Sequence, residues 1–121
     1  MSWDVELVDP VSKETLMCEA PHYVRGGIYA QGGTTELWLN ITYNYGRIYR
    51  RPDVFGEECG LNILNGKTAA ETIPMLKNAI SNLGDDVSPD YWEATDGNAK
   101  RALCSLLVFA QMRPDGIWYI S

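Results

Sequence analysis

Residues 43–51 (YNYGRIYRR) carry arginine and tyrosine side chains together in an otherwise acidic chain. The window has three arginines and no carboxylate, whereas the whole chain has a formal charge of -6. A guanidinium binds phosphate or carboxylate through two parallel hydrogen bonds, and a tyrosine ring stacks on a base. The window therefore predicts an anion-binding segment containing Tyr45, Arg47, Arg50 and Arg51. The alternative is that these arginines pair with carboxylates of the same chain.

Residues 91–101 form a second candidate, at the predicted start of a helix. The free N–H groups and the dipole of a helix start favour an anion. Lys100 and Arg101 add positive charge where it is unfavourable for the helix itself, and Trp92 adds an aromatic ring. A bound anion would contact Thr95, Asn98, Lys100 and Arg101. The alternative is a first helical turn whose basic residues face solvent.

Phosphate-loop and catalytic motifs are not found in the sequence. Gly66-Lys67-Thr68 resembles the end of a P-loop, but Leu61 stands where that motif requires glycine. These residues are better explained by a turn followed by a capping box. His22 is the single histidine, in an expected extended loop, and no nucleophile–base pattern accompanies it. We therefore predict no catalytic residue and no cofactor.

The three cysteines, Cys18, Cys59 and Cys104, are widely separated and form no CxxC pair. With one histidine in the chain they give no zinc-site spacing, so no metal site is predicted. We interpret them as reduced, mostly buried thiols of a reducing compartment.

The first half of the chain is predicted to form strands. Residues 3–8 and 14–20 alternate apolar and polar side chains on either side of a turn, which indicates a β-hairpin. Residues 36–43 form the clearest strand, with leucine, isoleucine and tyrosine on one face. Its other face carries Trp38, Asn40 and Thr42. That face is too polar for a core and too aromatic for plain solvent, so it is a candidate binding face.

The second half is predicted to be helical. A capping box at residues 68–71 starts an amphipathic helix that runs to Gly84, with Pro74 expected to kink it or delay its start. Ser88 and Pro89 begin a short helical turn, and Asp96 caps a second helix to about Met112. Residues 117–120 form a last strand. The prediction is one α+β domain over residues 1–121, with an antiparallel sheet from the N-terminal half and a C-terminal strand packed against two main helices.

Composition excludes several classes of function. Sixteen acidic against ten basic residues argue against binding to duplex nucleic acid, which needs a basic face. No apolar run approaches the length of a membrane span, and the N-terminal residues show no signal peptide. We therefore expect a cytoplasmic protein.

Several motifs resemble a family of small proteins encoded by bacteriophages and prophages. They are RGGIYAQGGTTE at residues 25–36, LNITYNY at 39–45, GKT at 66–68, YWEATDGNAKRAL at 91–103 and MRPDGIW at 112–118, and the resemblance extends over nearly the whole chain. It implies expression in a bacterial host cytoplasm. It also implies an accessory role against host defence, either by sequestering a nucleotide second messenger or by covering a defence protein.

The leading prediction is a non-enzymatic protein that sequesters a small, nucleotide-like anion, with the site completed in a homo-oligomer. Two alternatives stay open: an inhibitor that binds a host defence protein directly, and a small nucleotide-processing enzyme. The predicted ligand-binding residues are Trp38, Asn40, Thr42, Tyr45, Arg47, Arg50, Arg51, Trp92, Thr95, Asn98, Lys100, Arg101 and Trp118.

Overall fold

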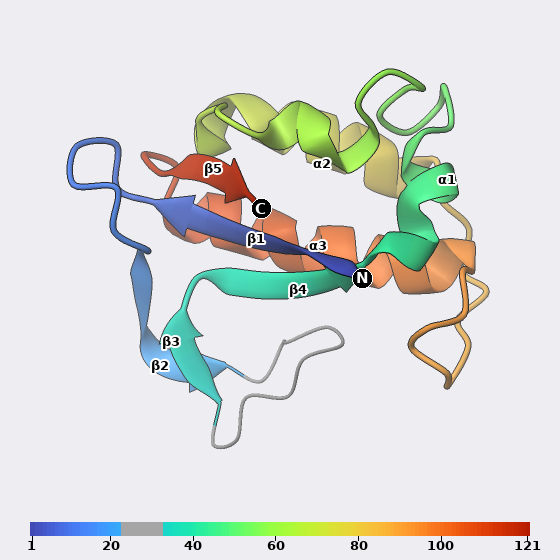
Figure 1. The fold of residues 1–121 in the computed structure, drawn as a ribbon, viewed down its shortest axis with the longest axis horizontal. Helices are drawn as coiled ribbons and strands as arrows, with labels where there is room; N and C mark the ends of the chain where they lie inside the picture. Colours follow the sequence, from blue (N-terminus) through green and yellow to red (C-terminus); the bar gives the residue numbers. More distant parts are fainter. Residues whose placement is uncertain (23–32) are drawn as a thin grey trace.

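Strand β1 (Ser2–Val8) is the central strand of a three-stranded antiparallel sheet in the computed structural model, which describes residues 1–22 and 33–121. It pairs with β4 (Trp38–Thr42) on one side and with β5 (Ile117–Ile120) on the other, as Figure 1 shows. Trp3, Val5 and Leu7 point into the core, as their alternation with polar residues predicts.

The helices cover the inner face of this sheet. α2 (Ala69–Ser81) and α3 (Asp96–Met112) pack against each other, and the short α1 (Gly46–Tyr49) lies near the start of α3 (Figure 1). Two 3-10 helices, η1 (Tyr43–Tyr45) and η2 (Gly60–Leu64), flank α1 in the chain. The predicted α+β class and its sheet composition are therefore confirmed.

Two buried side chains connect these layers through hydrogen bonds. Trp118 of β5 is 1% exposed, and its Nε1 donates to Thr72 Oγ1 of α2 at 2.8 Å. The Tyr49 hydroxyl of α1 donates to the backbone oxygen of Ala99 in α3 at 3.0 Å. Because both polar groups are satisfied, these large aromatic rings can be buried without an unpaired donor.

The hairpin predicted for residues 3–8 and 14–20 forms only next to its turn, where Val8 and Thr15 make an isolated antiparallel bridge, and its second strand is wrong. β2 (Met17–His22) pairs with β3 (Thr34–Glu36) in a separate two-stranded sheet, and His22 is the last residue of β2. Leu16 N donates to Leu7 O at 2.8 Å, but the next contacts along β1 are made by Leu37 and β4. β4 occupies the position beside β1, so the chain beyond Leu16 finds a different partner strand.

The strand predicted over residues 36–43 is interrupted at Leu37 and ends at Thr42. Tyr43, expected on the inner face, instead begins η1 and is 42% exposed. The carbonyl of Leu37 accepts from Leu7 N at 3.0 Å. Leu37 therefore lies beside β1, although it belongs to neither β3 nor β4.

The predicted helices form, with corrected boundaries. The Thr68–Glu71 capping box is present, but α2 ends at Ser81 and not at Gly84, and Pro74 lies inside it. Pro74 is exposed, so the carbonyl that loses its N–H partner can be solvated. The N-cap of α3 is Thr95, one residue before the predicted Asp96.

Three further predictions are settled by the described residues. Residues 88–93 form a bend and turn, not a helical turn. Gly66 has a φ of 83° in a turn that leads into the capping box, so the P-loop explanation is correctly rejected. Cys59 and Cys104 are exposed and Cys18 is partly exposed, so "mostly buried" is wrong, although all three are free thiols. Within the described ranges, the helices are too short or too polar to cross a membrane.

Candidate functional site

The loop of residues 84–95 is fastened to the free edge of β4 by Tyr91. β4 is an edge strand, so alternate backbone groups point away from β1 and need partners. The Tyr91 hydroxyl accepts from Thr42 N at 3.0 Å and lies 3.3 Å from Asn40 O, to which it donates. The Tyr45 hydroxyl donates in turn to the backbone oxygen of Tyr91. One tyrosine therefore terminates the sheet edge and positions the loop.

Asn98 holds the same loop from the other side. Its Nδ2 donates to Asp90 O at 3.0 Å and to Glu93 O at 3.1 Å, and its Oδ1 accepts from Ser88 N at 3.1 Å. The residue is 5% exposed. Because its amide is engaged by the loop backbone, Asn98 positions the loop and has no group directed at a ligand.

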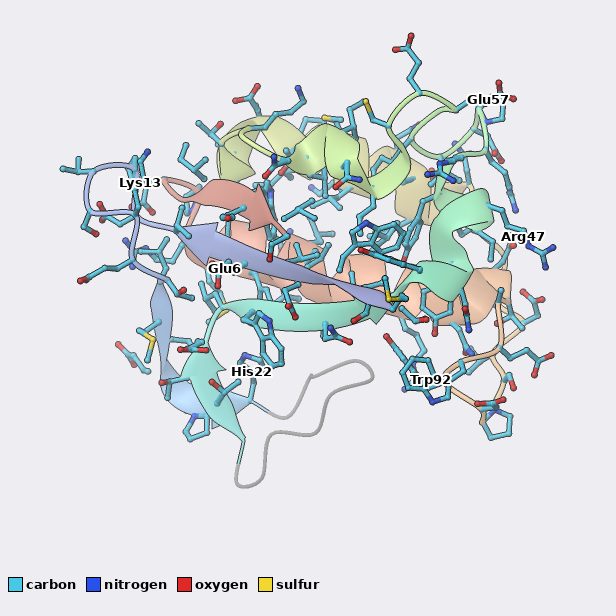
Figure 2. The ribbon with its side chains drawn as sticks, in the orientation of Figure 1. Glu6, Lys13, His22, Arg47, Glu57 and Trp92 are labelled. Carbon is cyan, nitrogen blue, oxygen red and sulfur yellow. The ribbon has the colours of Figure 1, made fainter. Side chains whose placement is uncertain are left out.

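The loop presents Trp92 beside residues that follow β4. Trp92 is 49% exposed and Tyr43 is 42% exposed, and Asn44 Nδ2 donates to Trp92 O at 2.8 Å. Figure 2 shows Arg47 of α1 and Trp92 at the same end of the molecule. We call the surface formed by Tyr43, Asn44, Arg47, Trp92 and Arg101 the aromatic–basic surface.

Arg47 and Arg101 are exposed, and neither forms an ion pair with any described residue. Arg101 lies three residues after Asn98 on α3, on the side that faces the loop. Burial raises the pKa of Tyr45 well above its ordinary value, and the positive charge of Arg101 opposes this shift. The Tyr45 hydroxyl is therefore within electrostatic range of Arg101.

The carboxylates of the loop are engaged by the loop itself. Asp90 Oδ1 accepts from Trp92 N at 3.1 Å, and Glu93 Oε2 accepts from the Ser88 hydroxyl at 2.6 Å. Neither carboxylate lies within ion-pair distance of Arg101. Among the described residues neither guanidinium of the aromatic–basic surface has a hydrogen-bond acceptor, so both have donors for an external one.

Arg51 behaves as the alternative explanation states, because it pairs with carboxylates of the same chain. Its guanidinium lies 2.9 Å from Asp96 and 3.0 Å from Asp53. The backbone N–H of Gly84, together with Arg51, holds the pKa of Asp96 below its usual range despite partial burial. This network ties α1 to the start of α3 and is structural.

The start of α3 is likewise occupied by residues of the chain. Gly97 N donates to Asp86 Oδ1 at 3.3 Å, and Asn98 N donates to the Thr95 hydroxyl at 3.1 Å. Lys100 Nζ lies 2.7 Å from Asp85. The acidic pair at 85–86 and the Thr95 cap therefore take the place that a bound anion was expected to fill.

The predicted face of β4 is a hydrogen-bonded part of the sheet. Asn40 Nδ2 donates to Ser2 Oγ at 2.7 Å and to Asp4 Oδ1 at 3.1 Å, and Trp38 Nε1 donates to the same Asp4 oxygen at 3.2 Å. Asn40 and Thr42 are each 1% exposed, and Thr42 accepts from Asn44 N to cap η1. The polar groups of this face are therefore engaged within the chain, except for Asn40 Oδ1, which is buried and has no hydrogen-bond partner among the described residues.

The remaining predicted residues lie apart from this surface. Trp118 and Tyr45 are buried in the core and cannot stack on a ligand from outside. Arg50 is exposed, and its side chain packs over Gly60. A Cβ atom added to Gly60 would lie 3.0 Å from Arg50 Cγ. Of the thirteen predicted residues, the structure thus brings Arg47, Trp92 and Arg101 to one exposed surface.

Tyr43, Asn44 and Tyr91 lie in the two predicted windows, 43–51 and 91–101, but are not among the predicted ligand-binding residues. Tyr43 continues the apolar alternation of residues 37–41, which predicts a place on the inner face. No sequence pattern shows that β4 ends at Thr42, one residue before it. The role of Tyr91 at the β4 edge depends on Thr42 and Asn40, which are far away in sequence. No group of metal-ligating side chains gathers within residues 1–22 and 33–121.

Comparison with protein-family models, with curated proteins and with solved structures finds no match to this chain.

Proposed function

We propose that this protein is a non-enzymatic binder that sequesters a small, nucleotide-like anion on the aromatic–basic surface. The observation that carries the proposal is a half-exposed Trp92 accompanied by two arginines, Arg47 and Arg101, that have no ion-pair partner among the described residues. Of the other candidate cations near this end, Arg51 and Lys100 are already paired, whereas the exposed Arg50 packs over Gly60.

The chemistry of the surface matches the two parts of a nucleotide. A base stacks on the indole of Trp92, an interaction that contributes about 1–3 kcal/mol in single-stranded nucleic-acid complexes. Arg47 and Arg101 donate to phosphate oxygens, and such charge-assisted bonds are about twice as strong as neutral ones. Asn44 keeps Trp92 in place through its bond to the Trp92 carbonyl.

The resemblance to phage-encoded proteins suggests a biological setting for this binding. In the cytoplasm of a bacterial host, a protein that withholds a nucleotide second messenger would act against host defence. A second copy of the chain would add ring surface and charge to an open site, so we include a homo-oligomer in the proposal.

A second candidate function is direct binding to a host defence protein. Tryptophan, tyrosine and arginine are the residue types that dominate protein–protein interfaces, and here they share one exposed surface. The loop that carries Trp92 is held by Tyr91 and Asn98, so the surface is preorganised for a partner.

A thermal-shift titration against linear and cyclic nucleotides tests the leading proposal. A ligand that binds the folded state alone stabilises it by about 2.7 kcal/mol at a hundredfold excess over Kd. We expect the shift to be lost in Trp92→Ala and in the Arg47→Glu/Arg101→Glu double variant. Lys77→Glu, a charge reversal at an exposed position of α2, should keep it.

Recovery of the ligand separates sequestration from turnover, because a binding protein releases the nucleotide unchanged after denaturation. If no nucleotide shifts the melting temperature, or if the surface variants bind as the wild type does, the nucleotide proposal fails. Retention of a host protein by the wild type and its loss in Trp92→Ala would then support the second candidate.

A further inference from the structure

A groove of about 310 Å³ lies on the sheet near the turn that follows β1, at a different end of the molecule from Trp92 (Figure 2). Such a volume is at the lower end of small-molecule sites, which span roughly 300–1,000 Å³. Its lining consists of Glu6, Val8, Lys13, Ile117, Trp118 and Tyr119.

The floor of the groove is the outer face of β1 and β5. Glu6 stands directly opposite Tyr119, and Val8 directly opposite Ile117, so these four side chains share one face of the sheet. The helices pack on the opposite face, where Trp118 is bonded to Thr72. Tyr119 is consequently 46% exposed.

Lys13, which lines the groove, belongs to the turn of residues 9–15, and this turn is held in place by hydrogen bonds. Asp9 N donates to Glu14 O at 2.8 Å, and Lys13 N donates to Asp9 O at 3.0 Å. The Thr15 hydroxyl donates to Glu6 Oε2 at 3.0 Å, which joins the turn to the floor. Lys13 adopts a φ of 65°, and its Nζ donates to Pro10 O at 3.0 Å. The groove is therefore a formed feature with Lys13 at its rim.

The groove combines both signs of charge with an apolar floor. Neither Glu6 nor Lys13 forms an ion pair with a described residue. One carboxylate oxygen of Glu6 accepts from the Thr15 hydroxyl, so the other oxygen is left for a ligand. The Lys13 ammonium has three N–H donors and uses one of them for Pro10 O. Ile117 and the Tyr119 ring supply apolar surface in the same groove, whose lining also includes the buried Val8.

We propose that this groove binds a small zwitterion with an apolar side chain, that is, an α-amino acid or a dipeptide. The ligand's ammonium group donates to the free oxygen of Glu6, and its carboxylate accepts from Lys13. Its side chain lies on Val8, Ile117 and Tyr119. A ligand with a single charge would leave one of the two protein charges without a partner. The binding is independent of the nucleotide proposal, because the two sites share no residue.

The test is a titration of the isotope-labelled full chain with L-leucine, followed by NMR. We expect saturable shifts of the amide signals of Glu6, Val8, Ile117 and Tyr119. N-acetyl-leucine, which lacks the ammonium group, and leucinamide, which lacks the carboxylate, should each bind at least about tenfold more weakly, since each loses one charge-assisted hydrogen bond.

Two conservative variants assign the charges. Glu6→Gln retains an acceptor for Thr15 and should bind leucine and N-acetyl-leucine equally. Lys13→Met should bind leucine and leucinamide equally, whereas Lys77→Met serves as the control and should behave as the wild type. The amide spectrum of each variant reports whether the fold is retained. Absence of saturable shifts with leucine, or equal binding of all three compounds by the wild type, overturns the proposal.

Discussion

Replacement of Tyr91 by phenylalanine removes one oxygen atom and tests how the loop is held on β4. That hydroxyl is bonded to the backbone N–H of Thr42 and to the carbonyl of Asn40, and both residues are 1% exposed. A buried backbone group that loses its partner costs about 1–3 kcal/mol. We expect Tyr91→Phe to lower the free energy of unfolding by this amount.

The expected change in melting temperature follows from the length of the chain. Unfolding entropy is about 2.1 cal/mol/K per residue, so for 121 residues 1 kcal/mol corresponds to about 4 °C. Tyr91→Phe should therefore lower Tm by about 4–12 °C in scanning calorimetry. Tyr43→Phe is the matched control, because it removes the same atom from a ring whose hydroxyl makes no hydrogen bond with the described residues. Its effect should stay within about 0.5 kcal/mol, as for other surface changes.

Amide hydrogen exchange gives a second, residue-specific measurement. The Thr42 amide loses its acceptor in Tyr91→Phe and should exchange faster than in the wild type, whereas Tyr43→Phe should leave it unchanged. Equal stability losses in both variants would refute the reasoning. So would an unchanged Thr42 exchange rate in Tyr91→Phe, because the hydroxyl would then not be the partner of this amide.

Two further predictions concern packing and pH. Gly97→Ala should lower stability by about 1–3 kcal/mol in urea unfolding, because a Cβ there would lie 2.7 Å from the backbone carbon of Asp86. Gly46→Ala, where the nearest atom is 3.6 Å away on Trp3, should cause no such loss. The Thr68 backbone N–H lowers the pKa of Glu71 from 4.5, so the stabilisation by this carboxylate is complete above pH 4.5 and is lost as the pH falls below it. Urea unfolding on either side of that pH should show a smaller decline in Glu71→Gln, and an equal decline would contradict the assignment.

The sequence predicted correctly those helices and strands that are marked by a pattern of a few neighbouring residues. The alternation of Trp3, Val5 and Leu7 correctly identified the inner face of β1, and the Thr68–Glu71 box correctly identified the start of α2. These signals follow from the periods of a strand and a helix and from the bonding needs of a helix start. The α+β class was accessible for the same reason.

Long-range choices were not accessible from the sequence. β2 has the alternation of a hairpin partner, but the place beside β1 is taken by β4, which follows later in the chain. Asn40 and Thr42 occupy the polar face of a strand, and a binding role was inferred from that polarity. Their burial depends in part on Tyr91, about fifty residues away in sequence, whose docking no local pattern announces.

The charge of a sequence window also proved a poor guide to the charge of a surface. Arg51 belongs to the basic window, yet Asp96 and Asp53 neutralise it, and Asp85 neutralises Lys100. Arg47 on α1 and Arg101 on α3, in contrast, form no ion pair with a described residue. In a chain of net charge -6, two such groups can attract a small anion at close range. A polyanion would also meet the surrounding carboxylates. Because screening weakens interactions beyond about 10 Å at 0.1 M salt, the local pair of arginines should dominate the attraction of an anion to this surface. On the proposed function, we therefore expect this surface to bind a small phosphate compound in preference to a nucleic acid.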